Sequence, residues 1–318
     1  MTVPTAVRAG RAAALFAKFQ TGLGSAATSF AASNRLWQTA VGKMTDSRFP
    51  HDASMHITAG PPSAATYRQP ARVTGEIEFH ATPTSLDIAL RSALGTGYAI
   101  DSQIAAANRL TLAWVEDVGG TQRVVRVKDA WFYEISIDIP SRGKALVRAR
   151  YAAGGDPIIA TYAASGCTFP ADPAMPSDKE IYPGPTATWV RDPLVAAVEL
   201  RFARLALEIK SGLRFDYSQA TGGYEVYKRG VTRAEISWDG DYSDESWTVL
   251  TNALAGTAQR YRARLLAEDG GTATFTMHNL LLDFGDGPGA RGREYARQRA
   301  RGEAAMDDSG NFFSAAIA

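Results

Sequence analysis

The stretch GEIEFHATPTSLDIALRSALGTG (residues 75–97) is matched half a chain later by AEISWDGDYSDESWTVLTNALAG (residues 234–256). In each, an alternating apolar run typical of a strand leads into a capped run with helical spacing. A hairpin pattern follows both, and its turn reads EDVGGT at 116–121 and EDGGT at 268–272. The repeated order predicts an internal duplication, with chance similarity of short pieces as the alternative. Two repeats are too few for a solenoid, so we expect two similar α+β domains.

The first copy predicts a strand and then a helix. Residues 72–79 (RVTGEIEF) alternate apolar and polar side chains, as a half-buried strand does. The helix should begin at Thr84 or Ser85, which are good N-caps, with Asp87 in the first turn. Gly95 should end it.

The hairpin of the first copy should form from residues 109–117 and 122–139, and residues 144–153 predict a closing strand. In the long middle strand, alternation sorts the side chains into two sets: Trp131, Tyr133, Ile135, Ile137 and Ile139 on one side, and Phe132, Glu134, Ser136 and Asp138 on the other. This strand should therefore present a mainly apolar face.

The second copy should have Ser243 as its helix N-cap, with the acidic residues Asp244 and Glu245 in the first turn. The segment 194–209 fits either a strand or a helix, because its apolar residues also recur at helical spacing.

The predicted organisation is an N-terminal arm at 1–50, a first domain at 51–153, a connection at 154–195 and a second domain at 196–318. The arm is rich in Ala, Ser, Thr and Gly; residues 11–19 could form a short helix, and the rest should be extended. The connection holds seven of the fifteen prolines, a density that excludes a long helix or a central strand.

An Arg-rich segment at 285–310 reads as an insertion in the last hairpin of the second domain. Its arginines are Arg291, Arg293, Arg297, Arg299 and Arg301. The segment could be a solvated, mobile loop. It could instead be an arm whose arginines pair with carboxylates of a neighbouring subunit, and DNA contact is a third, weaker interpretation.

Composition limits the possible functions. The 318 residues carry a net charge of +1 and are 45% hydrophobic, which allows a sizeable core and argues against a dedicated nucleic-acid-binding protein. The one cysteine, Cys167, excludes an internal disulfide framework. No apolar run reaches the roughly 20 residues of a membrane span, and we expect no secretion signal.

The sequence contains none of the common catalytic motifs for nucleophilic serine, phosphate binding or dinucleotide binding. His51 and His56 fit no standard zinc spacing. Glu76 and Glu78 form an acid pair on one strand, but such pairs are common on solvated faces. We therefore predict no enzymatic activity, no metal and no cofactor.

The order of elements resembles that of the tail tube (major tail) proteins of long-tailed bacteriophages, in their tandem-domain form. The resemblance rests on the arm AALFAKFQTGLGSAAT (13–28), the following strands, the helix TSLDIALRSALG (84–95) and the hairpin sheet. It covers residues 10–152 and 196–318. It implies an α+β, mainly β fold: two tandem tail-tube-like β-sandwich or rolled-sheet domains, each with one flanking helix.

The resemblance implies a structural virion protein of the phage tail, assembled in the bacterial host cytoplasm. Subunits of this family form stacked rings whose inner sheets join into a β-barrel through which DNA passes during ejection. Six ring positions can be filled by three two-domain chains, so we expect a trimer with pseudo-six-fold symmetry. The connection 154–195 would lie outside, and the arm 1–50 and the loop 285–310 would bind adjacent rings.

The implied partners are other copies of the chain, a tape measure protein, and tail terminator or baseplate proteins. DNA would pass without specific binding, and no membrane is implied. Tube lumens of the family tend to be acidic, and the resemblance suggests these lumen-facing candidates at equivalent strand positions: Glu76, Glu78, Glu235 and Asp239. The five arginines of 285–310 are the candidates for contacts between rings.

Two other functions remain open from the sequence. A carbohydrate- or surface-binding β-sandwich module of a virion would present a face of exposed aromatic residues, and Trp131 and Tyr133 alternate suitably for one. A hydrolase would depend on the acid pair Glu76 and Glu78, and no motif supports it.

Overall fold

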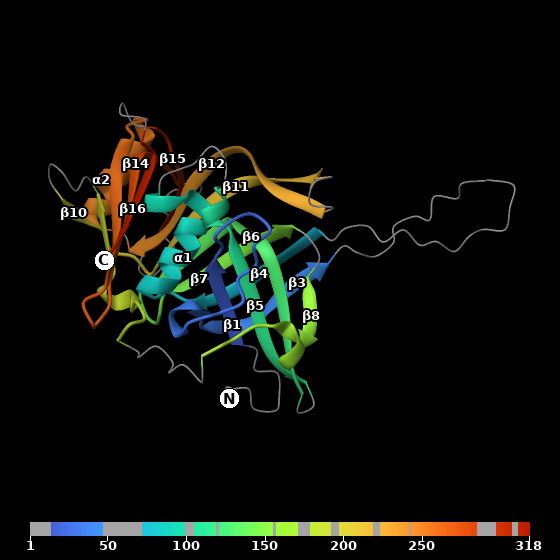
Figure 1. The fold of residues 1–318 in the computed structure, drawn as a ribbon. Helices are drawn as coiled ribbons and strands as arrows, with labels where there is room; N and C mark the ends of the chain where they lie inside the picture. Colours follow the sequence, from blue (N-terminus) through green and yellow to red (C-terminus); the bar gives the residue numbers. More distant parts are fainter. Residues whose placement is uncertain are drawn as a thin grey trace, which may run out of the picture.

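The computed structural model is mainly β, as predicted, with two α-helices beside an extensive antiparallel sheet (Figure 1). The structure describes residues 14–46, 72–98, 105–118, 121–154, 157–170, 179–191, 197–218, 223–241, 243–284, 297–306 and 311–318. In this part of the chain, neither helix is long and apolar enough to cross a membrane.

The strands and α-helices of the described residues fall into two series with the same order: four strands, one helix and four strands. The first half contains β1 (Ala14–Phe19), β2 (Arg35–Leu36), β3 (Gln38–Asp46), β4 (Arg72–His80), α1 (Pro83–Leu94), β5 (Leu110–Val118), β6 (Thr121–Pro140), β7 (Leu146–Gly154) and β8 (Ile158–Thr161). The second half contains β9 (Thr188–Arg191), β10 (Val198–Glu199), β11 (Arg204–Ser218), β12 (Gly223–Asp241), α2 (Asp244–Leu254), β13 (Gln259–Leu266), β14 (Thr272–Asp283), β15 (Arg297–Ala304) and β16 (Phe313–Ile317).

Strand pairing is also the same in the two halves. In the first, β1 pairs with β2 and β5, β4 pairs with β3 and β7, and β6 pairs with β5, β7 and β8. In the second, β9 pairs with β10 and β13, β12 pairs with β11 and β15, and β14 pairs with β13, β15 and β16. The repeat therefore extends well beyond the stretches that match in sequence.

A shared irregularity supports this correspondence. The register of each hairpin shifts near one end, and the bulged strand there carries a non-glycine residue with positive φ: Asp129 at 54° in β6 and Asn279 at 49° in β14. Asp and Asn tolerate this left-handed conformation better than most residues. Both halves therefore bend the hairpin at the same place.

The halves are joined edge to edge rather than through a separate linker. Residues 134–140 of β6 pair antiparallel with residues 204–210 of β11, which makes one continuous sheet. Near this junction Trp131 packs in a buried cluster with Val226 of β12. The buried Arg109 guanidinium donates a hydrogen bond to the carbonyl oxygen of Val226.

The helix termini follow simple capping rules, with one correction. The N-cap of α1 is Thr82, two residues before the predicted Thr84, because Pro83 fits the first helical position and the Thr82 hydroxyl accepts from the Ser85 amide. Asp87 consequently lies beyond the first turn. The C-cap at Gly95 and the N-cap at Ser243 are confirmed.

Several local predictions for the first half were wrong. The expected helix within 11–19 is strand β1, which is stabilised by pairing with β5. The alternation predicted for 122–139 breaks at a bulge between Phe132 and Glu134, so Phe132 joins the main core while Trp131 and Tyr133 face the other way.

The connection and the second half also differ from expectation. The proline-rich segment contains strands β8 and β9, and β9 lies between β10 and β13. In the ambiguous segment 194–209, the described residues 198–199 and 204–209 form strands. Part of the expected loop 285–310 is β15, which pairs with β12 and β14. Residues 285–296 and 307–310 lie outside the described part.

Candidate functional site

One face of the joined sheet is lined with charged side chains from both halves. The face crosses strands β4, β7, β6, β11, β12 and β15, which are neighbours in that order. Its acidic residues are Glu76, Glu78, Glu134, Asp138, Glu208, Glu235, Asp239 and Glu303, and its basic residues are Arg148, Arg150, Arg204, Lys210, Arg233, Arg299 and Arg301. The opposite face is the apolar core, since strand residues alternate sides.

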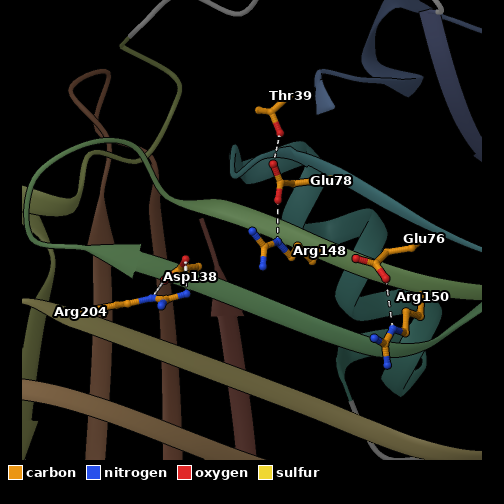
Figure 2. Close-up of polar contacts among 7 residues, drawn as sticks. All are labelled: Thr39, Glu76, Glu78, Asp138, Arg148, Arg150 and Arg204. Carbon is orange, nitrogen blue, oxygen red and sulfur yellow. Dashed lines mark hydrogen bonds and ion pairs between the residues drawn. The ribbon is translucent and has the colours of Figure 1, made fainter. Parts of the chain in front are cut away.

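Glu78 has the most defined environment on this charged face. Its carboxylate accepts a hydrogen bond from the Thr39 hydroxyl and lies 2.5 Å from the Arg148 Nε (Figure 2). These two partners, the Thr39 hydrogen bond above all, hold the pKa of Glu78 below its ordinary value. The same pair raises the pKa of Arg148.

Beside it, Arg150 bridges two acids. Its Nε is 3.3 Å from Glu76 (Figure 2). Its Nη1 is 3.1 Å from Glu134, so one guanidinium links three neighbouring strands. The hydrogen bond that the Arg150 Nε donates to the Glu76 carboxylate is the main reason that the pKa of Arg150 is raised. The row is a cross-strand ladder of alternating charge, an arrangement that stabilises a sheet modestly.

The ladder continues across the junction between the halves. Arg204 of β11 binds Asp138 of β6 through two hydrogen bonds of 2.7 and 2.8 Å (Figure 2). Farther along, the Lys210 ammonium lies 2.5 Å from Glu208 and 3.1 Å from Glu235. The junction is therefore matched in charge as well as in backbone pairing.

The far end of the face is more open. Arg299 lies 3.6 Å from Asp239, and Arg233 lies 3.7 Å from Glu303. The Arg299 side chain is 82% exposed, which leaves its guanidinium accessible to other molecules. Among the described side chains of this face, eight carboxylates and seven basic groups alternate, and most of them form ion pairs with one another.

The structure places the four carboxylate candidates on this one face. Glu78 and Asp239 are equivalent, because each lies four residues before its helix cap and opposite an arginine. Glu76 and Glu235 are not equivalent: Glu76 lies opposite Arg150, whereas Glu235 lies between Glu208 and Glu303.

The arginine candidates divide into two groups. Arg297, Arg299 and Arg301 belong to β15, inside the sheet of their own chain. Arg291 and Arg293 lie outside the described residues. At least part of this segment therefore contributes to the chain's own sheet, and Arg299 has a carboxylate partner within the chain.

Sequence reasoning missed the basic half of the face. Arg148 and Arg150 alternate in the predicted strand 144–153 with buried Val147, Ala149 and Tyr151, and this pattern alone places them on the polar side. Arg204 had no such signal, because the fold of its segment was ambiguous.

The competing functions find little support in this geometry. Trp131 is fully buried and packs against Tyr133, so this pair does not form an exposed aromatic platform. A general acid needs a raised pKa, and the pKa of Glu78 is lowered. Among the described residues, no cluster of three or more His, Cys, Asp or Glu side chains could hold a metal ion.

Replacing Glu78 with Gln should lower stability at pH 7 by less than about 1 kcal/mol, because the pair is near the surface. The folded-state pKa lies below the ordinary value of 4.5, so the ionised carboxylate stabilises the fold at neutral pH. This contribution is lost as the pH falls through the folded-state pKa. Urea unfolding of both proteins should therefore show a difference that shrinks from pH 7 to about pH 3.

Thr39→Val keeps both charges and removes the hydroxyl donor, so it should reproduce part of this pH-dependent difference. A difference between wild type and Glu78→Gln that is the same at both pH values would contradict the role assigned to the ion pair.

Comparison with known proteins adds little to this geometry. No protein-family model matches the chain, and no curated protein matches it. Among solved structures, it is similar to a chain in the cryo-EM structure of the anti-feeding prophage baseplate, six-fold symmetrised. That similarity has 10% identity, covers 42% of this chain and 90% of the other, and has a TM-score of 0.29. Such a weak similarity does not assign a function.

Proposed function

We propose that the chain is a structural subunit that polymerises through its sheet edges into stacked rings, forming a phage tail tube through which DNA is delivered. The observation that carries this proposal is the edge-to-edge joining of two topologically identical halves by β6 and β11. A unit that joins its own duplicate in this way is suited to join further copies.

An open sheet edge also supports association with further copies of the chain. In the second half, β11 pairs with β12 on one side and β6 on the other. Its counterpart β3, within the described pairings, has only β4. Unpaired edges are a liability that proteins cover or use for assembly, and a neighbouring copy would cover this one.

The charged face suits a conduit. Most of its described basic groups have an acidic partner on the same face, which reduces the positive charge available to phosphate groups. DNA affinity depends on the number of phosphates that Lys and Arg neutralise, and a channel must let DNA pass rather than hold it. We propose that this face, with Glu76, Glu78, Glu235 and Asp239, lines the lumen.

Three two-unit chains would fill a six-position ring. Negative-stain electron microscopy over a concentration series, with native mass spectrometry of the same sample, should show stacked rings of three chains. Six chains per ring would keep the tube and contradict this account of the duplicated fold. A chain that remains monomeric at every concentration would argue against self-polymerisation.

A further inference from the structure

The two helices hold equivalent places in the repeat but differ in exposure. α1 packs on β6 and α2 packs on β14, each starting from a hydroxyl N-cap. Eight residues of α1 are buried, against three of α2. Counterpart positions show the difference. Four residues after the N-cap, Leu86 of α1 is 0% exposed and Trp247 of α2 is 47% exposed. Eleven residues after the N-cap, Ala93 of α1 is 3% exposed and Leu254 of α2 is 79% exposed.

The second half of the chain accounts for the burial of α1. Strand β16 contacts α1, and its residues Ala315 and Ile317 pack against the core that contains the apolar face of the helix. The β13–β14 turn also approaches the start of α1: a Cβ on Gly271 would lie 2.9 Å from the Pro83 ring. In Figure 1, α1 lies in the middle of the molecule, whereas α2 lies at its edge.

The repeat identifies what should cover α2. The counterpart of β16 is β8, because β8 pairs with β6 as β16 pairs with β14. Ile159 of β8 is 58% exposed and is the counterpart of Ala315, because it pairs with Val125 of β6 as Ala315 pairs with Phe275 of β14. α2 and β8 lie on opposite sides of the molecule, so one chain cannot bring them together (Figure 1).

We propose that β8 of a second copy covers α2, in a head-to-tail contact that repeats the contact between β16 and α1 inside each chain. The inference rests on the proposed self-association and names the surfaces that carry it. A second copy is the occupant because it presents the counterpart of the strand that already covers the equivalent helix. The apolar side chains on both surfaces would leave water on association.

Cross-linking of two single-cysteine proteins tests this contact. Both carry Cys167→Ser; one adds Leu254→Cys on α2 and the other adds Ile159→Cys on β8. The two proteins are mixed and treated with a short bismaleimide. The expected product joins position 254 of one copy to position 159 of another, with little 254–254 or 159–159 product, since a head-to-tail contact is not symmetric.

The possible results separate the contact from the tube. Rings whose cross-links do not join 254 to 159 would overturn the contact and leave the proposed function standing. Dimers cross-linked between positions 254 and 159, from a protein that never forms rings, would support the contact and count against the tube. A protein that neither assembles nor cross-links would overturn both.

A matched pair of variants on α2 gives a second measurement. Leu254→Lys should weaken self-association at least about tenfold by sedimentation, because a charge replaces an apolar side chain in the contact. Lysine is favourable in the last turn of a helix, so the monomer should fold normally. Glu245→Gln is the control, since its counterpart Thr84 stays exposed in α1, and it should leave association unchanged. Equal association of all three proteins would overturn the proposal.

Discussion

Trp238→Ala is expected to lose about 3–5 kcal/mol of unfolding free energy, the range for truncating a buried Trp. Trp238 is 1% exposed on β12, beside the junction of the two halves. Its indole Nε1 donates a 3.0 Å hydrogen bond to the Arg201 carbonyl oxygen. Its ring packs edge-on against the Phe284 ring, with 6.3 Å between the ring centroids. The alanine variant would leave both a cavity and a carbonyl without its donor. Urea unfolding at low protein concentration measures the loss.

Trp238→Phe is the matched control. Phenylalanine keeps most of the buried ring and loses the Nε1 donor, so its cost should be nearer to that of one hydrogen bond, about 1 kcal/mol. An alanine variant no less stable than the phenylalanine variant would show that the ring does not anchor this part of the core.

Gly184→Ala is expected to destabilise the chain by about 3 kcal/mol or more, at the upper end of what overpacking costs. A Cβ at Gly184 would lie 1.6 Å from the Pro140 carbonyl oxygen and 2.8 Å from the Pro140 carbonyl carbon. These are backbone atoms at the end of β6, where β6 pairs with Arg204 of β11. Neither segment can turn aside as a flexible side chain would, so the connection must move away from the junction.

Gly22→Ala serves as the control, because the nearest atom to its added Cβ is the Ser25 hydroxyl at an ordinary 3.7 Å. Its stability should change by less than about 1 kcal/mol. Circular dichroism melts and urea titrations of both variants are sufficient. Equal stability of the two variants would contradict the close packing of the connection on β6.

The elements that sequence predicted best are those decided by neighbouring residues. The strand at 72–79 and both helices depend on alternation, helical spacing and caps, all of which lie within a few residues. The N-cap lies at Thr82 rather than at Thr84 because Pro83 takes the first helical position, where its missing N–H costs nothing. Alternation places Glu76 and Glu78 on one side of their strand, whereas the pairing of each acid with an arginine depends on which strands are neighbours.

The elements that sequence missed are those decided by distant pairing. Strand β15, with the sequence RQRARGEA, has weak strand propensity and forms between β12 and β14. At Gly302 a Cβ would lie 2.5 Å from the Leu281 carbonyl oxygen, so glycine is needed there for the strands to approach. The short apolar β1 reads as helix or strand until β5 is known to lie beside it.

The β6–β11 junction also has a kinetic consequence. Because both strands belong to one chain, this junction forms at an effective concentration on the order of millimolar, however dilute the protein is. In the proposed ring, three of six junctions would form during folding and only three would await encounters between molecules. The two copies of the repeat are then free to diverge. The helix that is covered within its own chain buries eight of its residues, whereas α2 buries three and exposes polar residues such as Thr248 and Thr251 until a neighbour arrives.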